Sequence, residues 1–304
     1  MKAVMSLWTK PYLEKLKNGQ KNPFGFPSET DYWMSWALSI LQARKYIGPV
    51  TVYTDRVGAE VLKTILDMPI GGISLALEEH AVLQNTPWQI WTQGKLVTYQ
   101  EQREPFIHFD SDVFFWKPPE FENTAKVPNL FAQSPETVQP EEVDVDWGYY
   151  PERLISKLNM VSDVWEYPRL RRAYCMGICG GMDYKFFQRY AMEALNLISA
   201  NTKPLREILS EPKGRYCIHV MEQYLFALMA AKQDKEVTTL FRTAEGVYSP
   251  YDEAEAAEKG YTHLIAGSKM NPKANKNVEV RVQKQDSLLW QRIINFNGLS
   301  SYLP

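Results

Sequence analysis

The chain has 304 residues, of which 45% are hydrophobic, so it can bury a large core in one large domain or two small ones. Its formal net charge of −2 gives no reason to expect a surface for nucleic acid. The three cysteines cannot form a disulfide framework, and neither a signal sequence nor a membrane span can be recognised. We therefore expect a soluble, cytoplasmic protein with small, buried cysteine side chains.

The first part of the chain alternates between strand and helix patterns. Short apolar runs predict strands over residues 3–8, 50–54, 73–77 and 106–109. Apolar residues at helical spacing predict helices after the capping segment that starts at Ser28, over 57–67 and over 88–102. This alternation predicts an α/β fold with a mostly parallel central sheet flanked by crossover helices.

The second part is less regular. Residues 123–151 have the composition of an acidic loop, and residues 174–181 form a small, apolar run. Helices are predicted after Asp183, whose side chain suits an N-cap, over 216–232, over the charged segment 252–260, and over 286–296. Without a repeat or a clear linker, we expect a single domain over residues 1–304 with two subregions, 1–116 and 117–304.

The segment Pro105–Trp116 carries the strongest functional signal. An apolar run ends in Asp110-Ser111-Asp112, and a second apolar run follows at once. Ionised carboxylates at the end of a buried strand are costly to desolvate unless a cation pairs with them. Mn²⁺ or Mg²⁺ carrying a diphosphate is such a partner, because both ions take hard oxygen ligands.

The ends of the predicted parallel strands bring further polar residues toward the same edge. Thr9 and Asp55 follow the first two strands, as the aspartate pair follows the fourth. Ligands of parallel sheets collect at the carboxyl ends of the strands, so we expect these residues near a bound nucleotide. A second triplet, Asp144-Val145-Asp146, has no apolar run before it and is interpreted as a solvated loop.

The third candidate segment is Thr262–Lys269, where an apolar run contains a histidine and leads to Gly-Ser-Lys. His263 can complete the first shell of a metal through a neutral ring nitrogen. Gly267 lets backbone approach a phosphate, and Lys269 can pair with that phosphate. Taken alone, the same residues are also compatible with a structural histidine and a surface lysine.

Together these segments resemble a GT-A-type glycosyltransferase, in particular the retaining family 8 enzymes, which are glycogenin-like or bacterial galactosyl- and glucosyltransferases. The matching features are the Asp-x-Asp strand, a small-residue strand at Gly177–Gly181, and an acidic-Gln pair at Glu222-Gln223. A histidine and lysine of the C-terminal motif match His263 and Lys269. Glu222 stands where Asp is usual, and the glycine between His263 and Lys269 is displaced by one position.

The resemblance implies a metal-dependent, retaining glycosyltransferase that moves a sugar from a nucleoside-diphosphate sugar, with UDP as nucleotide, to an unknown glycan or other acceptor. Residues 1–116 would form the nucleotide-binding half and 117–304 an acceptor-side α+β half. Mn²⁺ or Mg²⁺ would be held by Asp110, Asp112 and His263. The catalytic residues would be Glu222 and Gln223, which face the sugar, and Lys269. The donor would contact the following residues: Trp8, Thr9, Asp55, Lys95, Asp110 and Ser111.

Several alternatives remain open from the sequence. Lys95 could be a solvated helix lysine, and Trp8 could be part of the core. If stereochemistry were inverted, Glu222 or Asp183 would have to act as general base. A non-catalytic nucleotide- or sugar-binding protein would keep the same residues. A haloacid-dehalogenase-type phosphohydrolase also uses Asp-x-Asp, but on its first strand and followed by a threonine, where this chain has Phe114.

Overall fold

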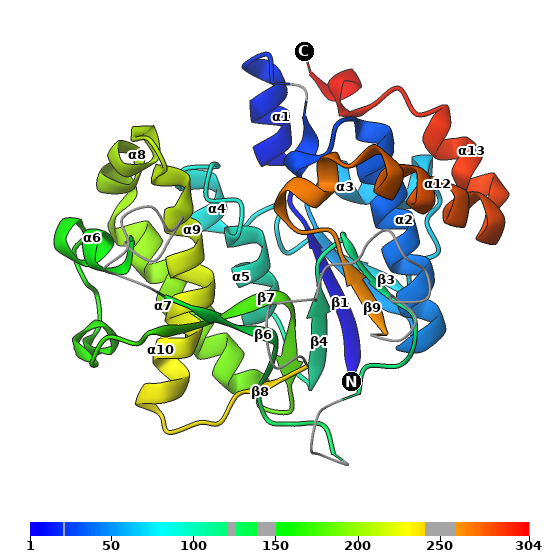
Figure 1. Ribbon diagram of the computed structural model, residues 1–304. Helices are drawn as coiled ribbons and strands as arrows, with labels where there is room; N and C mark the ends of the chain where they lie inside the picture. Colours follow the sequence, from blue (N-terminus) through cyan, green and yellow to red (C-terminus); the bar gives the residue numbers. More distant parts are fainter. Residues whose placement is uncertain (21, 121–125, 139–149, 241–259, 304) are drawn as a thin grey trace. The chain divides into compact units, whose positions relative to one another are not determined.

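The computed structural model describes residues 1–20, 22–120, 126–138, 150–240 and 260–303 (Figure 1). The predicted loop at residues 144–146 lies outside the described residues. The same is true of the predicted helix at 252–260, apart from Gly260.

The chain forms two compact units, each assembled from separate stretches of sequence. We call them the Asp112 unit (residues 2–78, 108–120 and 245–304) and the Glu222 unit (residues 1, 79–107 and 121–244). The expectation of a single domain with halves at 1–116 and 117–304 stays a prediction.

The fold is α/β, as predicted, with a mixed sheet flanked by helices. Seven strands follow the order β3-β2-β1-β4-β7-β6-β8, and β5 pairs with β9 in a separate sheet. β1 and β2 are parallel, as are β2 and β3, and β6 and β8, whereas β6 and β7 are antiparallel. The strands are β1 (Lys2–Leu7), β2 (Val50–Thr54), β3 (Gly72–Ser74), β4 (Phe106–Phe109), β5 (Val113–Phe115), β6 (Phe131–Thr137), β7 (Arg172–Gly181), β8 (Thr238–Thr239) and β9 (Tyr261–His263).

The Asp112 unit is organised around α2 (Glu29–Tyr46). This helix begins where the Ser28 hydroxyl accepts a hydrogen bond from the Asp31 amide, as the capping pattern predicted. Most of its side chains are buried, and it contacts β5, α12 and α13. Figure 1 shows α12 and α13 in orange and red beside α2. The other helical segments are α1 (Lys10–Lys17), η1 (Pro23–Gly25), α3 (Arg56–Ala59), the π-helical η2 (Glu60–Ile65), η6 (Ala266–Met270), α12 (Pro272–Gln285), α13 (Ser287–Ile294) and η7 (Leu299–Tyr302).

The Glu222 unit is built on the contact between α5 (Gln93–Gln100) and α7 (Tyr184–Ala200). Aromatic rings fill this region; for example, the ring centroids of Phe106 and Phe187 are 4.9 Å apart in an edge-to-face arrangement. The other helical segments are α4 (Ala81–Asn85), α6 (Tyr150–Lys157), η3 (Asp163–Glu166), α8 (Thr202–Ser210), η4 (Gly214–Tyr216), α9 (Cys217–His219), the π-helical η5 (Val220–Tyr224) and α10 (Leu225–Lys232).

The small residues of β7 are required by close backbone approach. Gly180 has φ +151°, and a Cβ there would lie 2.1 Å from the Phe106 carbonyl oxygen. A Cβ on Gly181 would lie equally close to the Asn129 carbonyl. The small, apolar run that the sequence showed is therefore a packing requirement of the strand.

Two predictions of local structure were wrong in part, and one helix was missed. The described part of the loop predicted at 123–151 contains the strand β6. Its polar sequence, Gln-Ser-Pro-Glu-Thr, does not have the apolar pattern of a strand. The helix predicted at 88–102 begins only at Gln93. The helix α12 was not predicted, because only Ala274, Val278 and Val282 mark its buried face in a charged sequence.

Two further expectations can be compared with the structure. All three cysteine side chains are buried thiols, as predicted. Among the helices that the structure describes, none combines the length and the apolar character that a membrane crossing requires.

Candidate functional site

The loop that carries the aspartate pair is held by α2. A turn is closed by the Val113 amide, which donates to the Asp110 carbonyl over 3.1 Å. Two buried serines of α2 bind the same backbone: Ser35 Oγ donates to the Ser111 carbonyl at 2.8 Å, and Ser39 Oγ to the Asp110 carbonyl at 3.4 Å. Hydrogen bonds from α2 therefore help to fix the backbone of the aspartate loop.

His263 is brought to this loop by strand pairing. β9 runs antiparallel to β5 with His263 opposite Val113, and the Leu264 amide donates to the Asp112 carbonyl at 2.9 Å. The histidine thus lies beside a residue that is distant in the sequence. The apolar run before Lys269 forms β9, and the pairing of β9 with β5 places His263 at the site.

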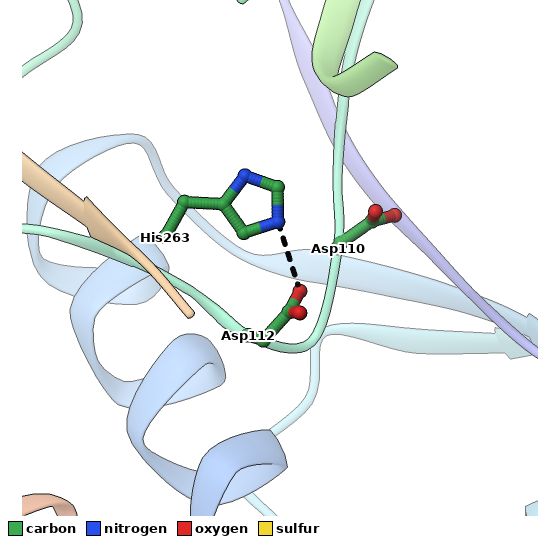
Figure 2. Close-up of side chains that lie close together, drawn as sticks. All are labelled: Asp110, Asp112 and His263. Atoms are coloured by element: carbon green, nitrogen blue, oxygen red, sulfur yellow. Dashed lines mark ion pairs between the residues drawn. The ribbon is translucent and has the colours of Figure 1, made fainter. Parts of the chain in front are cut away.

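Asp110, Asp112 and His263 form a compact group in which one ligand atom from each residue lies within 4.8 Å of the others. His263 Nε2 is 3.4 Å from Asp112 Oδ1, and the two side chains face each other in Figure 2. Lys269 Nζ lies 2.7 Å from Asp112 Oδ2. Burial by itself would raise the pKa of Asp112, but Lys269 and His263 outweigh it and hold that pKa well below its usual range.

This group can bind a divalent metal ion. Its donors are two carboxylates and an imidazole, a mixture that suits Mn²⁺ and is compatible with Mg²⁺. Around an octahedral ion with ligands about 2.1 Å away, neighbouring ligands lie about 3.0 Å apart and opposite ones about 4.2 Å, so these side chains would have to close in on a bound ion. The predicted metal ligands are therefore assembled in one unit.

Thr9 and Asp55 also meet, but they bond to each other. The Thr9 amide donates to Asp55 Oδ2 at 2.7 Å, the Thr9 hydroxyl lies 2.9 Å from both carboxylate oxygens, and the Gly58 amide donates to Oδ1. Burial raises the pKa of Asp55, and these hydrogen bonds partly oppose that rise. Trp8, which precedes Thr9 in the chain, is also buried. The nucleotide contacts expected of these three residues stay predictions.

In the Glu222 unit, Lys95 is not the solvated helix lysine that the sequence allowed. Its ammonium donates to Glu222 Oε1 at 2.7 Å, and only 8% and 3% of the two side chains are exposed. The ammonium also lies 3.5 Å from the Met176 carbonyl and 5.7 Å from the centroid of the Trp91 ring. A lysine and a glutamate predicted to act on the donor thus form a buried ion pair.

Glu222 and Gln223 lie in a π-helical turn, η5, at the point where a regular helix would be expected. π-helical turns are rare and frequently mark functional sites. The Tyr190 hydroxyl donates to the Glu222 carbonyl at 2.6 Å, which ties the turn to α7. Gln223 Oε1 is buried and has no hydrogen-bond partner in the part of the chain that the structure describes.

Glu136 is a candidate that the sequence analysis missed. It lies on β6, and its pKa is raised to about 7 by burial and by the nearby Glu222 carboxylate, while a hydrogen bond with Cys175 acts in the opposite direction. A carboxyl group that changes its charge near neutral pH is a common feature of active sites. No sequence signal marks Glu136, because its strand was interpreted as loop and its partners lie far away in the chain.

The structure gives Asp183 the capping role that the sequence predicted, and it also shows a contact of His108. Asp183 caps α7 by accepting from the Phe186 amide, and it pairs with Lys235 at 2.7 Å. His108 Nε2 lies 3.0 Å from the Ser6 hydroxyl, within the buried part of the Asp112 unit.

Comparisons with known proteins place the chain in a family. A family model matches residues 1–296, almost the entire sequence. The chain belongs to the family of unknown function DUF6734. No curated protein matches it.

Among solved structures, the chain is similar to the apo form of mouse xyloside xylosyltransferase 1, with 12% sequence identity and a TM-score of 0.40. The alignment covers 88% of this chain and 98% of that one.

Proposed function

We propose that this chain is a metal-dependent glycosyltransferase of the GT-A type, with a UDP-sugar as donor. The observation that carries the proposal is the group of Asp110, Asp112 and His263, with Lys269 on the same carboxylate. The reaction requires that a diphosphate be held and that its charge be neutralised as it leaves. A metal ion bound by this group would do both.

The charges of the group support a metal-bound diphosphate. Asp110, Asp112 and Lys269 together leave one negative charge if His263 is neutral. A divalent cation held by Asp110, Asp112 and His263 would reverse that charge and attract the diphosphate. Bound there, the metal would act as a Lewis acid toward the leaving group. Lys269, which lies on the edge of the group, would pair with a phosphate oxygen.

In the Glu222 unit, the proposal assigns Glu222 and Gln223 to the orientation of the transferred sugar. The Lys95 ammonium pairs with the Glu222 carboxylate in a buried position, and Gln223 Oε1, which has no hydrogen-bond partner among the described residues, would accept a hydrogen bond from a sugar hydroxyl. A retaining reaction needs no strong base. An inverting one would depend on Glu222, because Asp183 is occupied as a helix cap.

The phosphohydrolase alternative lacks support. That chemistry uses a nucleophilic aspartate directly after the first strand, whereas Asp110 follows β4. The position that would carry a threonine hydroxyl is Phe114, which is buried in β5.

The proposal is tested by calorimetric titration with UDP, with and without Mn²⁺. We expect Mn²⁺-dependent binding to the parent protein and its loss in Asp112→Ala. Asp163→Ala, which removes an exposed carboxylate paired with Lys232, is the matched control and should bind like the parent. If UDP and the other nucleoside diphosphates fail to bind the folded parent with Mn²⁺ present, the proposal is wrong. If UDP binds but a panel of UDP-sugars is neither transferred nor hydrolysed, the chain is a binding protein.

A further inference from the structure

The carboxylate of Asp112 already has a cationic partner within the chain. Lys269 Nζ lies 2.7 Å from Oδ2, while His263 Nε2 lies 3.4 Å from Oδ1. The Lys269 side chain is 21% exposed and that of Asp112 only 5%, so solvent screens this pair weakly. A charge-assisted hydrogen bond of this length in a buried position is among the strong ones.

The position of Lys269 is fixed by its own surroundings. It belongs to η6, whose end is tied to α12 by Asn275, since the Asn275 side-chain amide donates to the Lys269 carbonyl at 2.8 Å. The ammonium also lies 3.5 Å from the Phe24 carbonyl and 5.4 Å from the centroid of the Phe26 ring. The lysine is therefore part of a packed turn and not a side chain that reaches Asp112 by chance.

A divalent cation at Asp112 has to compete with this ammonium. The two cations would share one carboxylate, and like charges at such short range repel each other. Uptake of the cation therefore requires that the Asp112–Lys269 contact lengthens or breaks. A diphosphate offers the displaced ammonium a new anionic partner, and it also adds oxygen ligands for the cation.

We propose that Lys269 is a built-in competitor of the divalent cation at Asp112, so that the site holds the cation weakly alone and firmly together with a nucleoside diphosphate. The competition for Asp112 follows from the geometry of the Asp112 unit. The role of the diphosphate rests on the proposed function. By linkage, the cation and the nucleotide must strengthen each other's binding by the same factor.

The first experiment measures Mn²⁺ binding without nucleotide, from the electron paramagnetic resonance signal of free Mn²⁺. We expect Lys269→Met to bind Mn²⁺ about tenfold to a hundredfold more tightly than the parent, because a charge-assisted hydrogen bond no longer has to be broken. Lys269→Arg keeps the charge and should bind like the parent. Lys273→Met removes an exposed lysine of the adjacent helix and should also leave the affinity unchanged.

The second experiment repeats the titration with saturating UDP. In the parent, UDP should raise the Mn²⁺ affinity more than it does in Lys269→Met. Equal nucleotide-free Mn²⁺ affinity in folded Lys269→Met, Lys269→Arg and parent overturns the inference. If Lys269→Met does not fold, Lys269→Gln is compared with Lys269→Arg by the same criterion. Failure of UDP to bind the parent refutes the proposed function, whereas tighter nucleotide-free Mn²⁺ binding in Lys269→Met still supports the competition.

Discussion

Replacing Lys95 by methionine should cost about 3–5 kcal/mol of unfolding free energy, which is the range for removing one partner of a buried ion pair. The methionine approximates the shape of the lysine stem but leaves the Glu222 carboxylate buried without its cation. The pair has an N–O distance of 2.7 Å, and 8% and 3% of the side chains are exposed. The expected loss is therefore far above that of a surface pair.

The magnitude follows from two opposing effects. At an effective dielectric constant of about 20, two unit charges at this separation attract each other by about 6 kcal/mol. Desolvation of both groups offsets much of that attraction in the native protein. Removing only the lysine abolishes the attraction but keeps the desolvation of Glu222, so the single substitution is costly. The double substitution Lys95→Met with Glu222→Gln removes both effects and should restore most of the stability.

Unfolding of the parent, both single variants and the double variant is followed in urea at pH 7, which gives the coupling energy of a double-mutant cycle. Lys235→Met is the matched control. It also breaks a lysine–carboxylate pair of 2.7 Å, with Asp183, but 32% and 22% of those side chains are exposed. This control should lose less than about 1 kcal/mol.

The reasoning is refuted if Lys95→Met loses no more stability than Lys235→Met. It is also refuted if the double variant is as unstable as the sum of the two single variants, because the two charges would then not interact. Either result would mean that water or another group stabilises the Glu222 carboxylate in place of Lys95.

The pH dependence of stability should report on Glu136. Its pKa is raised from 4.5 to about 7, so the native state keeps a proton that the unfolded chain loses, and stability should fall between these two pH values and then level off. Glu136→Gln should lack this fall and be about 1–3 kcal/mol more stable than the parent at pH 8; parallel pH curves for both proteins would contradict the assignment. Gly180→Ala should lower soluble yield and melting temperature strongly, because its Cβ would lie 2.1 Å from the Phe106 carbonyl. Gly267→Ala is the control, because nothing lies within 4 Å of a Cβ at that position. Equal melting temperatures for the two variants would show that the backbone of β7 shifts to accommodate the added Cβ.

The aspartate pair could be predicted because all the information lay within a few residues. The apolar runs before Asp110 and after Asp112 indicate buried strands, and the structure shows β4 and β5 at those positions. Helix caps are equally local, which is why Ser28 and Asp183 were interpreted correctly. The metal group needed one further step, the pairing of β9 with β5, which the sequence analysis did not predict.

Glu136 shows what local patterns miss. Its strand contains Pro135 and four polar residues, so neither periodicity nor propensity favours a strand. The strand exists because β7 pairs with it along most of its length. The raised pKa of Glu136 then comes from burial and from a carboxylate in η5, and no local pattern around Glu136 could indicate either cause.

The sequence by itself determined the α/β class, the strand that ends in Asp110-Ser111-Asp112, and the kinds of side chain available for a metal and a diphosphate. Only the tertiary structure decided which partner each of them has. Lys95 and Glu222 are separated by 127 positions, and Lys269 meets Asp112 through strand pairing and a packed turn. The reason is physical: whether a charged group is solvated, paired or buried depends on neighbours in space, and those neighbours are brought by packing of elements that are remote in the chain.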